Sequence, residues 1–97
     1  IGCMGLKVIG KGVGEIKRMW VDPTCRGLGV ARRLLAAAET HAADMALRRL
    51  RLDTSNRQEE ALSLYRHSGY CEIAPYNDNP YASYWFEKRL GTKRTPA

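Results

Sequence analysis

The 97-residue sequence has no apolar run that approaches the ~20 residues needed to cross a bilayer as a helix. Its first residues also lack the basic, apolar and small-residue order of a secretory signal. These two absences predict a chain without membrane contact, for which a cytoplasmic location is the default. The sequence has no internal repeat and no low-complexity segment. We therefore expect a single domain over residues 1–90 and a basic, flexible tail over residues 91–97.

Cysteine is scarce, and its spacing is uninformative for metals. Cys3, Cys25 and Cys71 are odd in number and form no Cys-x-x-Cys pair. This pattern favours neither a disulfide framework nor a zinc site. We expect reduced thiols and no bound metal.

Charge is unbalanced toward the basic side, with a formal net charge of +6. The lysines and arginines are spread over residues 15–21, 32–51 and 88–94 and do not gather on one face with interleaved aromatic residues. A nucleic-acid partner is therefore disfavoured. Some of these cations flank a glycine loop, where a polyphosphate cofactor would account for them.

The first half of the chain predicts a hairpin followed by a strand–helix–strand unit. Five glycines among apolar residues in 1–14 indicate a short strand at 3–8, a turn at 10–12 and a second strand at 15–21. From residue 30 to about residue 46 apolar side chains recur at three- and four-residue steps, which predicts an amphipathic helix. Residues 49–53 then alternate as a strand with one buried face. The strands on either side of the helix should be parallel, with a right-handed crossover.

The second half predicts a shorter helix and two more strands. The helix should span residues 58–68, with Ser55 or Asn56 as its cap and Gly69 just past its end. Residues 70–73 and 82–89 are typical of strands, joined by a loop over 75–80. The whole pattern predicts an α/β fold with a mixed sheet.

A glycine loop connects the second strand to the first helix and predicts an anion site. Gly27 and Gly29 allow positive φ and a close approach of the backbone to a ligand. The helix that follows offers unpaired N–H groups and the positive end of its dipole. Arg26 and Arg32 add positive charge beside this site.

Three phosphate-binding motifs compete for this loop. A Walker loop would need Lys-Ser/Thr after Gly29, where the chain has Val-Ala. A dinucleotide fingerprint would need glycine at the position of Arg32; it stays a weak rival because Asp53 stands where a ribose-binding acid would. The pattern Arg/Gln-x-x-Gly-x-Gly/Ala is satisfied at each specified place by residues 26–31.

With this last motif the chain resembles the GNAT superfamily of N-acetyltransferases, which use acetyl-coenzyme A. The resemblance covers roughly residues 14–90 and extends to the Val-Asp-Pro at 21–23, the Leu-Tyr-x-x-x-Gly-Tyr at 64–70 and the aromatic strand at 84–88. It implies the GNAT-like acyl-CoA N-acyltransferase fold. The implied activity is transfer of an acetyl group from acetyl-CoA to a primary amine, which attacks the thioester directly. The acceptor would be a small-molecule or peptide amine.

The resemblance also implies which residues bind the coenzyme. Pyrophosphate would rest on the loop amides, and the pantetheine arm would bond to the backbone of the strand before the loop. The residues implied in coenzyme binding are Met19, Trp20, Val21, Arg26, Gly27, Leu28, Gly29, Val30, Ala31, Arg32, Asn56 and Tyr65. For Arg32 the alternative is a solvated helix residue, and for Asn56 it is a helix cap.

Two residues are implied in catalysis. Tyr65 would protonate the leaving thiolate, with simple core packing as the alternative. Glu15 would act as general base, with a hairpin charge or an ion pair with Lys17 as the alternative. Solvated or packing roles are favoured for His41 and His67, and a covalent acetyl-enzyme on Cys25 is disfavoured. The tyrosines of residues 76–81 and Asp78 are candidates for contact with the acceptor, with turn formation as the alternative.

One part of the family pattern has no counterpart in this sequence. The family fold begins with a strand, two helices and a second strand before the point at which this chain starts, and these elements form one wall of the acceptor site. Three explanations stay open: the residues lie upstream, a second copy supplies the wall in a homodimer, or the fragment binds coenzyme without turnover. A non-catalytic acyl-CoA-binding module is accordingly the alternative to an enzyme.

Overall fold

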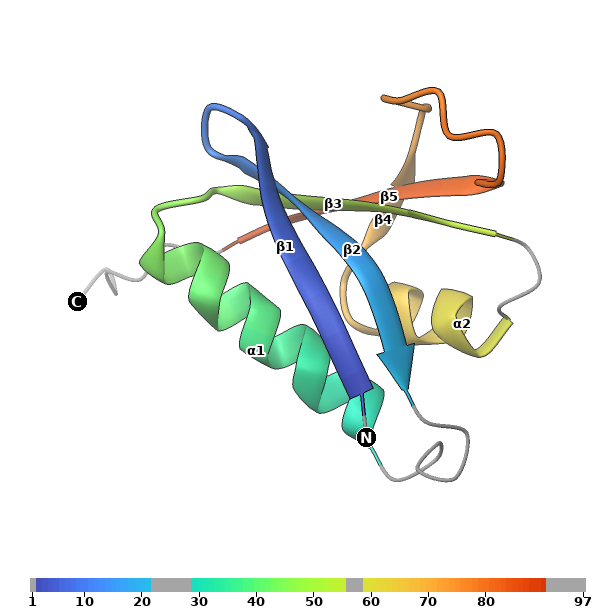
Figure 1. Ribbon diagram of the computed structural model, residues 1–97, viewed down its shortest axis with the longest axis horizontal. Helices are drawn as coiled ribbons and strands as arrows, with labels where there is room; N and C mark the ends of the chain where they lie inside the picture. The colour runs from blue at the N-terminus through green and yellow to red at the C-terminus, as the bar shows by residue number, and fades with distance from the viewer. Residues whose placement is uncertain (1, 22–28, 56–58, 91–97) are drawn as a thin grey trace.

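The computed structural model describes residues 2–21, 29–55 and 59–90 (Figure 1). Its five strands form one mixed sheet in the order β1-β2-β3-β5-β4. The elements are β1 Gly2–Gly10, β2 Val13–Val21, α1 Val30–Asp44, β3 Arg49–Thr54, α2 Glu59–His67, β4 Cys71–Ile73 and β5 Tyr84–Arg89. The predicted α/β fold and the order of its elements are confirmed, with boundaries that shift by one to two residues at most ends.

A long hairpin formed by β1 and β2 opens the fold. The strands pair antiparallel from Gly2 opposite Val21 to Gly10 opposite Val13. Gly12 occupies the turn with φ of +72°, a conformation that glycine adopts without steric cost. Its carbonyl oxygen accepts the backbone N–H groups of Arg48 and Arg49 at 2.6 and 3.0 Å. The hairpin turn is therefore attached to the start of β3.

Strands β2 and β3 are parallel, as the strand–helix–strand pattern predicts, but they pair over only part of their length. The register runs from Val13 opposite Arg49 to Glu15 opposite Arg51. Beyond this point β2 continues to Val21 while β3 pairs with β5 on its other side. The two strands diverge toward their carboxyl ends (Figure 1).

Both helices cover the same face of the sheet, and the core lies between (Figure 1). Buried side chains on this face come from β2, α1, β3, α2 and β5: Ile16, Leu35, Ala42, Leu50, Leu52, Leu62, Tyr65 and Phe86. The alternation in β3 separates the core face from the opposite face, since Leu50 and Leu52 are buried while Arg51 and Asp53 turn to the other face.

The opposite face of the sheet is polar. We call it the polar face and define it by Glu15, Lys17, Arg51, Asp53, Trp85 and Glu87. Successive strand residues point to opposite faces, and the cross-strand registers align these positions. Residues 74–83, which join β4 to β5, bond to this face at Glu15 and Asp53.

The helix ends follow recognisable local geometry. Gly69 has φ of +94° just past α2, as predicted for its C-terminal glycine. α1 ends at Asp44, two residues before the predicted end, because Ala46 has φ of +63°. The Leu47 N–H bonds the Ala42 carbonyl at 2.9 Å, the long bond of a Schellman motif. Neither described helix is long and apolar enough to cross a membrane.

Candidate active site

Gly29, the last residue of the glycine loop and the cap residue of α1, is the first loop residue that the structure describes. It has φ of +78° and ψ of 10°, and apart from its chain neighbours and the backbone of α1 no atom of the described residues would lie within 4 Å of a Cβ built on it. The first hydrogen bond of the helix runs from the Arg33 N–H to the Gly29 carbonyl at 3.1 Å. The amides of residues 30–32 precede this bond, so they have no helical acceptor.

The charge at this helix start favours an anion. The first turn of α1 contains no acidic residue, and the side chains of Arg32 and Arg33 are exposed beside it. Amides without an acceptor in the helix, the positive end of the helix dipole and two cations are the components of a phosphate site. Val30 and Ala31 supply backbone amides at this helix start.

The backbone of Met19, Trp20 and Val21 lies in the part of β2 that has left β3. Main-chain groups that face away from β1 there have no ladder partner in β3. A ligand with amide groups could pair with them as an added strand does. The other predicted coenzyme residues, Arg26, Gly27, Leu28 and Asn56, lie outside the described residues, as does Cys25.

Tyr65 lies in α2 within the core, with 4% of its surface exposed. Its ring is 5.9 Å from the rings of both Tyr70 and Phe86. Burial, and secondarily the charge of Asp53, raise the pKa of Tyr65 to about 12. The phenol therefore keeps its proton at neutral pH and can donate a hydrogen bond.

Glu15 is a buried carboxylate at the point where β2 and β3 separate. Only 4% of the residue is exposed. Its Oε1 lies 3.3 Å from Lys17 Nζ, the ion pair that the sequence offered as the alternative to a general-base role. Its Oε2 accepts the Tyr76 hydroxyl at 2.7 Å and the Asn77 side-chain amide at 3.3 Å. Burial and the bond to Glu15 raise the pKa of Tyr76 well above its ordinary value.

A second carboxylate, Asp53, lies beside Glu15 and is held by the same loop. Asp53 Oδ2 accepts Asn77 Nδ2 at 2.7 Å, and Asp53 Oδ1 accepts Asn79 Nδ2 at 3.1 Å. Asn77 Oδ1 in turn accepts the Trp85 indole N–H at 2.9 Å. Sequence reasoning assigned Asp53 only to a weak dinucleotide alternative and gave Asn77 and Asn79 no role beyond the turn. The Asn-x-Asn spacing at 77–79 is the signal that could have drawn attention to them.

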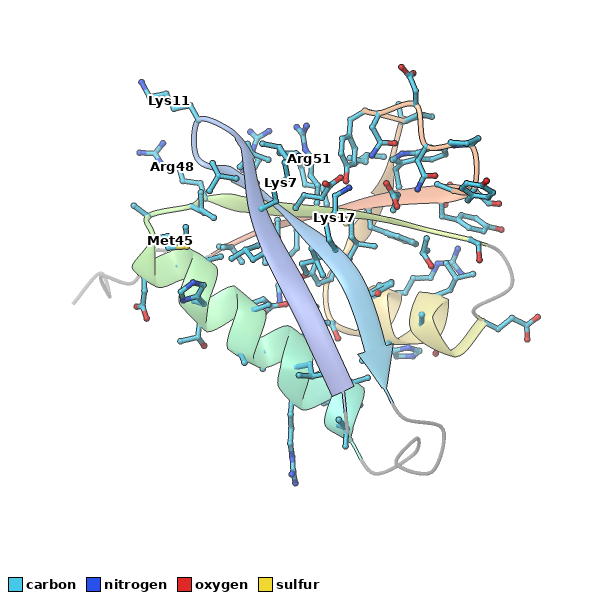
Figure 2. All side chains as sticks on the ribbon, viewed as in Figure 1. Lys7, Lys11, Lys17, Met45, Arg48 and Arg51 are labelled. Carbon is cyan, nitrogen blue, oxygen red and sulfur yellow. The ribbon has the colours of Figure 1, made fainter. Side chains whose placement is uncertain are left out.

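Cations surround Glu15 on the polar face. Lys7 is its cross-strand partner on β1, and Arg51 is its partner on β3. Arg51 Nε bonds Glu87 Oε1 at 2.8 Å, and the guanidinium lies 5.4 Å from the Tyr76 ring centroid. Lys7, Lys17 and Arg51 lie over neighbouring strands in Figure 2. Basic and acidic side chains therefore alternate across β1, β2, β3 and β5, in the order Lys7, Glu15, Arg51 and Glu87.

The side chains of the remaining candidates lie apart from this network, although the Tyr81 backbone N–H donates to Asn79 Oδ1 at 3.0 Å. Asp78 is exposed, and Tyr81 is 83% exposed. His41 is exposed on α1, while His67 Nδ1 lies 2.7 Å from the carbonyl oxygen of Ser63 in its own helix. Within the described ranges no three His, Cys, Asp or Glu side chains converge as a metal site requires.

Comparison with known proteins gives consistent matches. The sequence profile of the Acetyltransferase (GNAT) family matches residues 1–70. An IAA acetyltransferase from Azospirillum brasilense is 37% identical over 94 residues, which are 93% of this chain and 61% of that protein.

Two solved structures extend the comparison. A Klebsiella pneumoniae protein classed with the acyl-CoA N-acyltransferases is 36% identical, with a TM-score of 0.83 over 94% of this chain and 64% of that one. N-acetylglutamate synthase from Neisseria gonorrhoeae, complexed with coenzyme A and N-acetyl-glutamate, is 25% identical. Its TM-score is 0.78 over 93% of this chain and 23% of that one. The chain thus spans less than two thirds of each of these proteins.

Proposed function

Since the chain belongs to the GNAT family of acetyltransferases, we propose that it transfers an acetyl group from acetyl-CoA to a primary amine. The observation that carries this proposal is the geometry around the end of β2. There, a strand that has left its parallel neighbour precedes a helix whose cap is a positive-φ glycine, with no other described side chain within 4 Å of its Cβ position.

These residues fit an acyl-CoA. The pyrophosphate would be held by the amides of residues 30–32 and by the loop that includes Arg26, Gly27, Leu28 and Gly29. The pantetheine amides would bond to the backbone of Met19, Trp20 and Val21, with Asn56 as a further donor. The coenzyme A in the complex of N-acetylglutamate synthase, a protein of similar fold, supports an acyl-CoA as co-substrate.

The reaction we propose is direct attack. The amine nitrogen bonds to the thioester carbonyl carbon, the carbon–sulfur bond breaks, and the electron pair leaves on sulfur. The amine loses one proton and the thiolate gains one. Glu15 would take the amine proton, directly or through one water, and Tyr65 would donate toward sulfur.

The chemistry of Tyr65 limits the form of that donation. With its pKa raised to about 12, full proton transfer to a thiolate, whose conjugate acid has a pKa of ~8.5, is uphill by roughly 5 kcal/mol. A hydrogen bond to the sulfur as charge develops is free of this penalty and stabilises the transition state. We therefore assign Tyr65 as a hydrogen-bond donor to the leaving group, with complete protonation following from solvent.

One observation favours a second candidate, a non-catalytic acyl-CoA-binding module. Both oxygens of Glu15 already have partners within the protein, and the residue is almost entirely buried. A base in this state must exchange a partner for the amine or its water before it can accept a proton.

Thiol release from acetyl-CoA across a panel of amines separates the two candidates. Amine-dependent release supports the enzyme, whereas tight coenzyme binding without such release supports the binding module. Gly29→Glu tests the loop: a carboxylate at the helix start should weaken coenzyme affinity by at least tenfold through charge repulsion. Gly29→Gln is the matched control, since it has the same backbone strain and side-chain length without the charge. Equal calorimetric affinities for the two variants would reject the proposed phosphate site.

A further inference from the structure

The Asn77 side chain uses every hydrogen-bonding position of its amide. Nδ2 donates to Asp53 Oδ2 at 2.7 Å and to Glu15 Oε2 at 3.3 Å. Oδ1 accepts the Trp85 indole N–H at 2.9 Å and the backbone N–H of Asn79 at 3.2 Å. Two donors and two acceptors account for the whole capacity of an asparagine side chain.

The direction of this amide is fixed by its partners. An indole N–H and a backbone N–H can only donate, so the Asn77 oxygen must face Trp85 and Asn79. Ionised carboxylates can only accept, so the amide nitrogen must face Glu15 and Asp53. A reversed amide would lose all four bonds.

Asn77 therefore lies between two like charges. Glu15 and Asp53 come from neighbouring strands on the same face, and their carboxylates share this one nitrogen as a donor. Two carboxylates this close repel each other unless a donor or a cation separates them. The other titratable groups that face Glu15 come from β1, β2, β3 and the β4–β5 connection: Lys7, Lys17, Arg51 and Tyr76.

We propose that Asn77 is a positioning residue, which holds the Glu15 carboxylate in a fixed direction and separates it from Asp53. The inference rests on the proposed function, in which Glu15 receives the proton of the acceptor amine. Trp85 fixes Asn77, and Asn77 fixes Glu15. Through this relay the β4–β5 connection sets the geometry of a residue more than sixty positions away in the sequence.

The test compares Asn77→Asp with Asn79→Ala. Asn77→Asp replaces the shared donor by a third carboxylate at nearly constant shape, so the acid limb of the pH profile of kcat/KM should move upward by about one pH unit. Asn79→Ala is the matched control: it removes a donor to Asp53 in the same loop, but Asn79 has no contact with Glu15 among the described bonds. The acid limb of the pH profile of kcat/KM should not move in this control.

A purely structural role for Asn77 predicts a different pattern. Loosening the loop would lower the unfolding temperature in both variants without moving the limb in either. If Glu15→Gln loses turnover, so that the limb reports on Glu15, an unmoved limb in folded Asn77→Asp would overturn the proposal. Trp85→Phe provides a further variant should Asn77→Asp fail to fold. It leaves Asn77 in place but removes the indole donor that orients it, and should move the limb in the same direction by less.

A readout that does not depend on turnover separates this proposal from the proposed function. The side-chain carboxyl carbon of Glu15, assigned by its loss in Glu15→Gln, can be followed by NMR as pH is varied. A higher titration midpoint in Asn77→Asp than in the unmodified protein supports the positioning role even if Glu15→Gln retains full turnover, a result that would reject Glu15 as the base. Identical midpoints would overturn the positioning role, whatever the activity.

Discussion

Two buried tyrosines, Tyr65 and Tyr70, and the half-buried Tyr76 should make the fold sensitive to alkaline pH. Burial, the largest cause in each case, raises the pKa of Tyr65 to about 12 and those of Tyr70 and Tyr76 further. The charge of Glu39, whose Oε2 accepts the Tyr70 hydroxyl at 2.9 Å, adds to the effect on the pKa of Tyr70. In the unfolded chain all three phenols ionise near a pKa of about 10.

These raised pKa values determine whether the free energy of unfolding rises or falls with pH. Because the folded pKa values are raised, the unfolded state loses its phenolic protons first. The stabilisation is complete below about pH 10 and is lost as pH rises toward the folded values. Each tyrosine lowers the free energy of unfolding by about 1.4 kcal/mol per pH unit in that window, so the three together lower it by up to about 4 kcal/mol per unit. Against a typical domain stability of ~5–15 kcal/mol, unfolding should occur within roughly one to four units above pH 10.

Urea unfolding at closely spaced pH values measures this slope. Tyr70→Phe should reduce it by about a third, because one titrating group is removed. The control is Tyr81→Phe, which alters an exposed side chain and should leave the slope unchanged. Absorbance of tyrosinate adds a second probe, since the phenols of Tyr65, Tyr70 and Tyr76 should ionise together with unfolding. An equal slope in Tyr70→Phe and the unmodified protein would refute this reasoning, as would ionisation of all the tyrosines in the folded state.

Three further substitutions test other parts of the structure. Tyr65→Phe should lower kcat by about ten- to a hundredfold, equivalent to one hydrogen bond to a charged group, with little change in coenzyme Kd; an unchanged kcat would exclude the donor role. Gly14→Ala should lower the free energy of unfolding by ~1–3 kcal/mol, because the added Cβ would lie 2.8 Å from Leu47 Cδ1. Ala46→Gly should raise the free energy of unfolding by ~1 kcal/mol, because Ala46 has φ of +63°. Urea unfolding measures the effects of Gly14→Ala and Ala46→Gly, and a change of the opposite sign in either variant would contradict the local geometry.

The elements of this fold could be predicted from the sequence where periodicity is strong and local. The apolar steps in α1 and the Leu50–Leu52 alternation in β3 are set by which face each residue turns to the core. The parallel pairing of β2 and β3 follows from the helix between them. The early end of α1 did not follow, because the sequence shows no glycine at Ala46 to mark its left-handed geometry.

The candidate site could be predicted only in part, because some of its contacts join residues that are far apart in the sequence. Glu15 and Lys17 are two residues apart on one strand, so their ion pair is readable from the sequence. The bonds from Tyr76 and Asn77 to Glu15 join segments about sixty residues apart. No periodicity encodes such a contact, because it depends on where β5 places the loop against the sheet. Of the loop residues singled out by type, Tyr76 bonds Glu15, whereas Asp78 and Tyr81 are exposed.

Glu15 lies where the proposed coenzyme site meets the polar face of the sheet. Its position is the last at which β2 pairs with β3, so the backbone available to the coenzyme begins directly after it. Its side chain faces the opposite way from Ile16 in the core and is held by the β4–β5 connection on the polar face. A change in that connection therefore reaches the carboxylate without passing through the coenzyme site. Loop variants such as Asn77→Asp should accordingly alter the pH dependence of turnover while coenzyme affinity stays constant, and a parallel loss of both would place the loop in the coenzyme site instead.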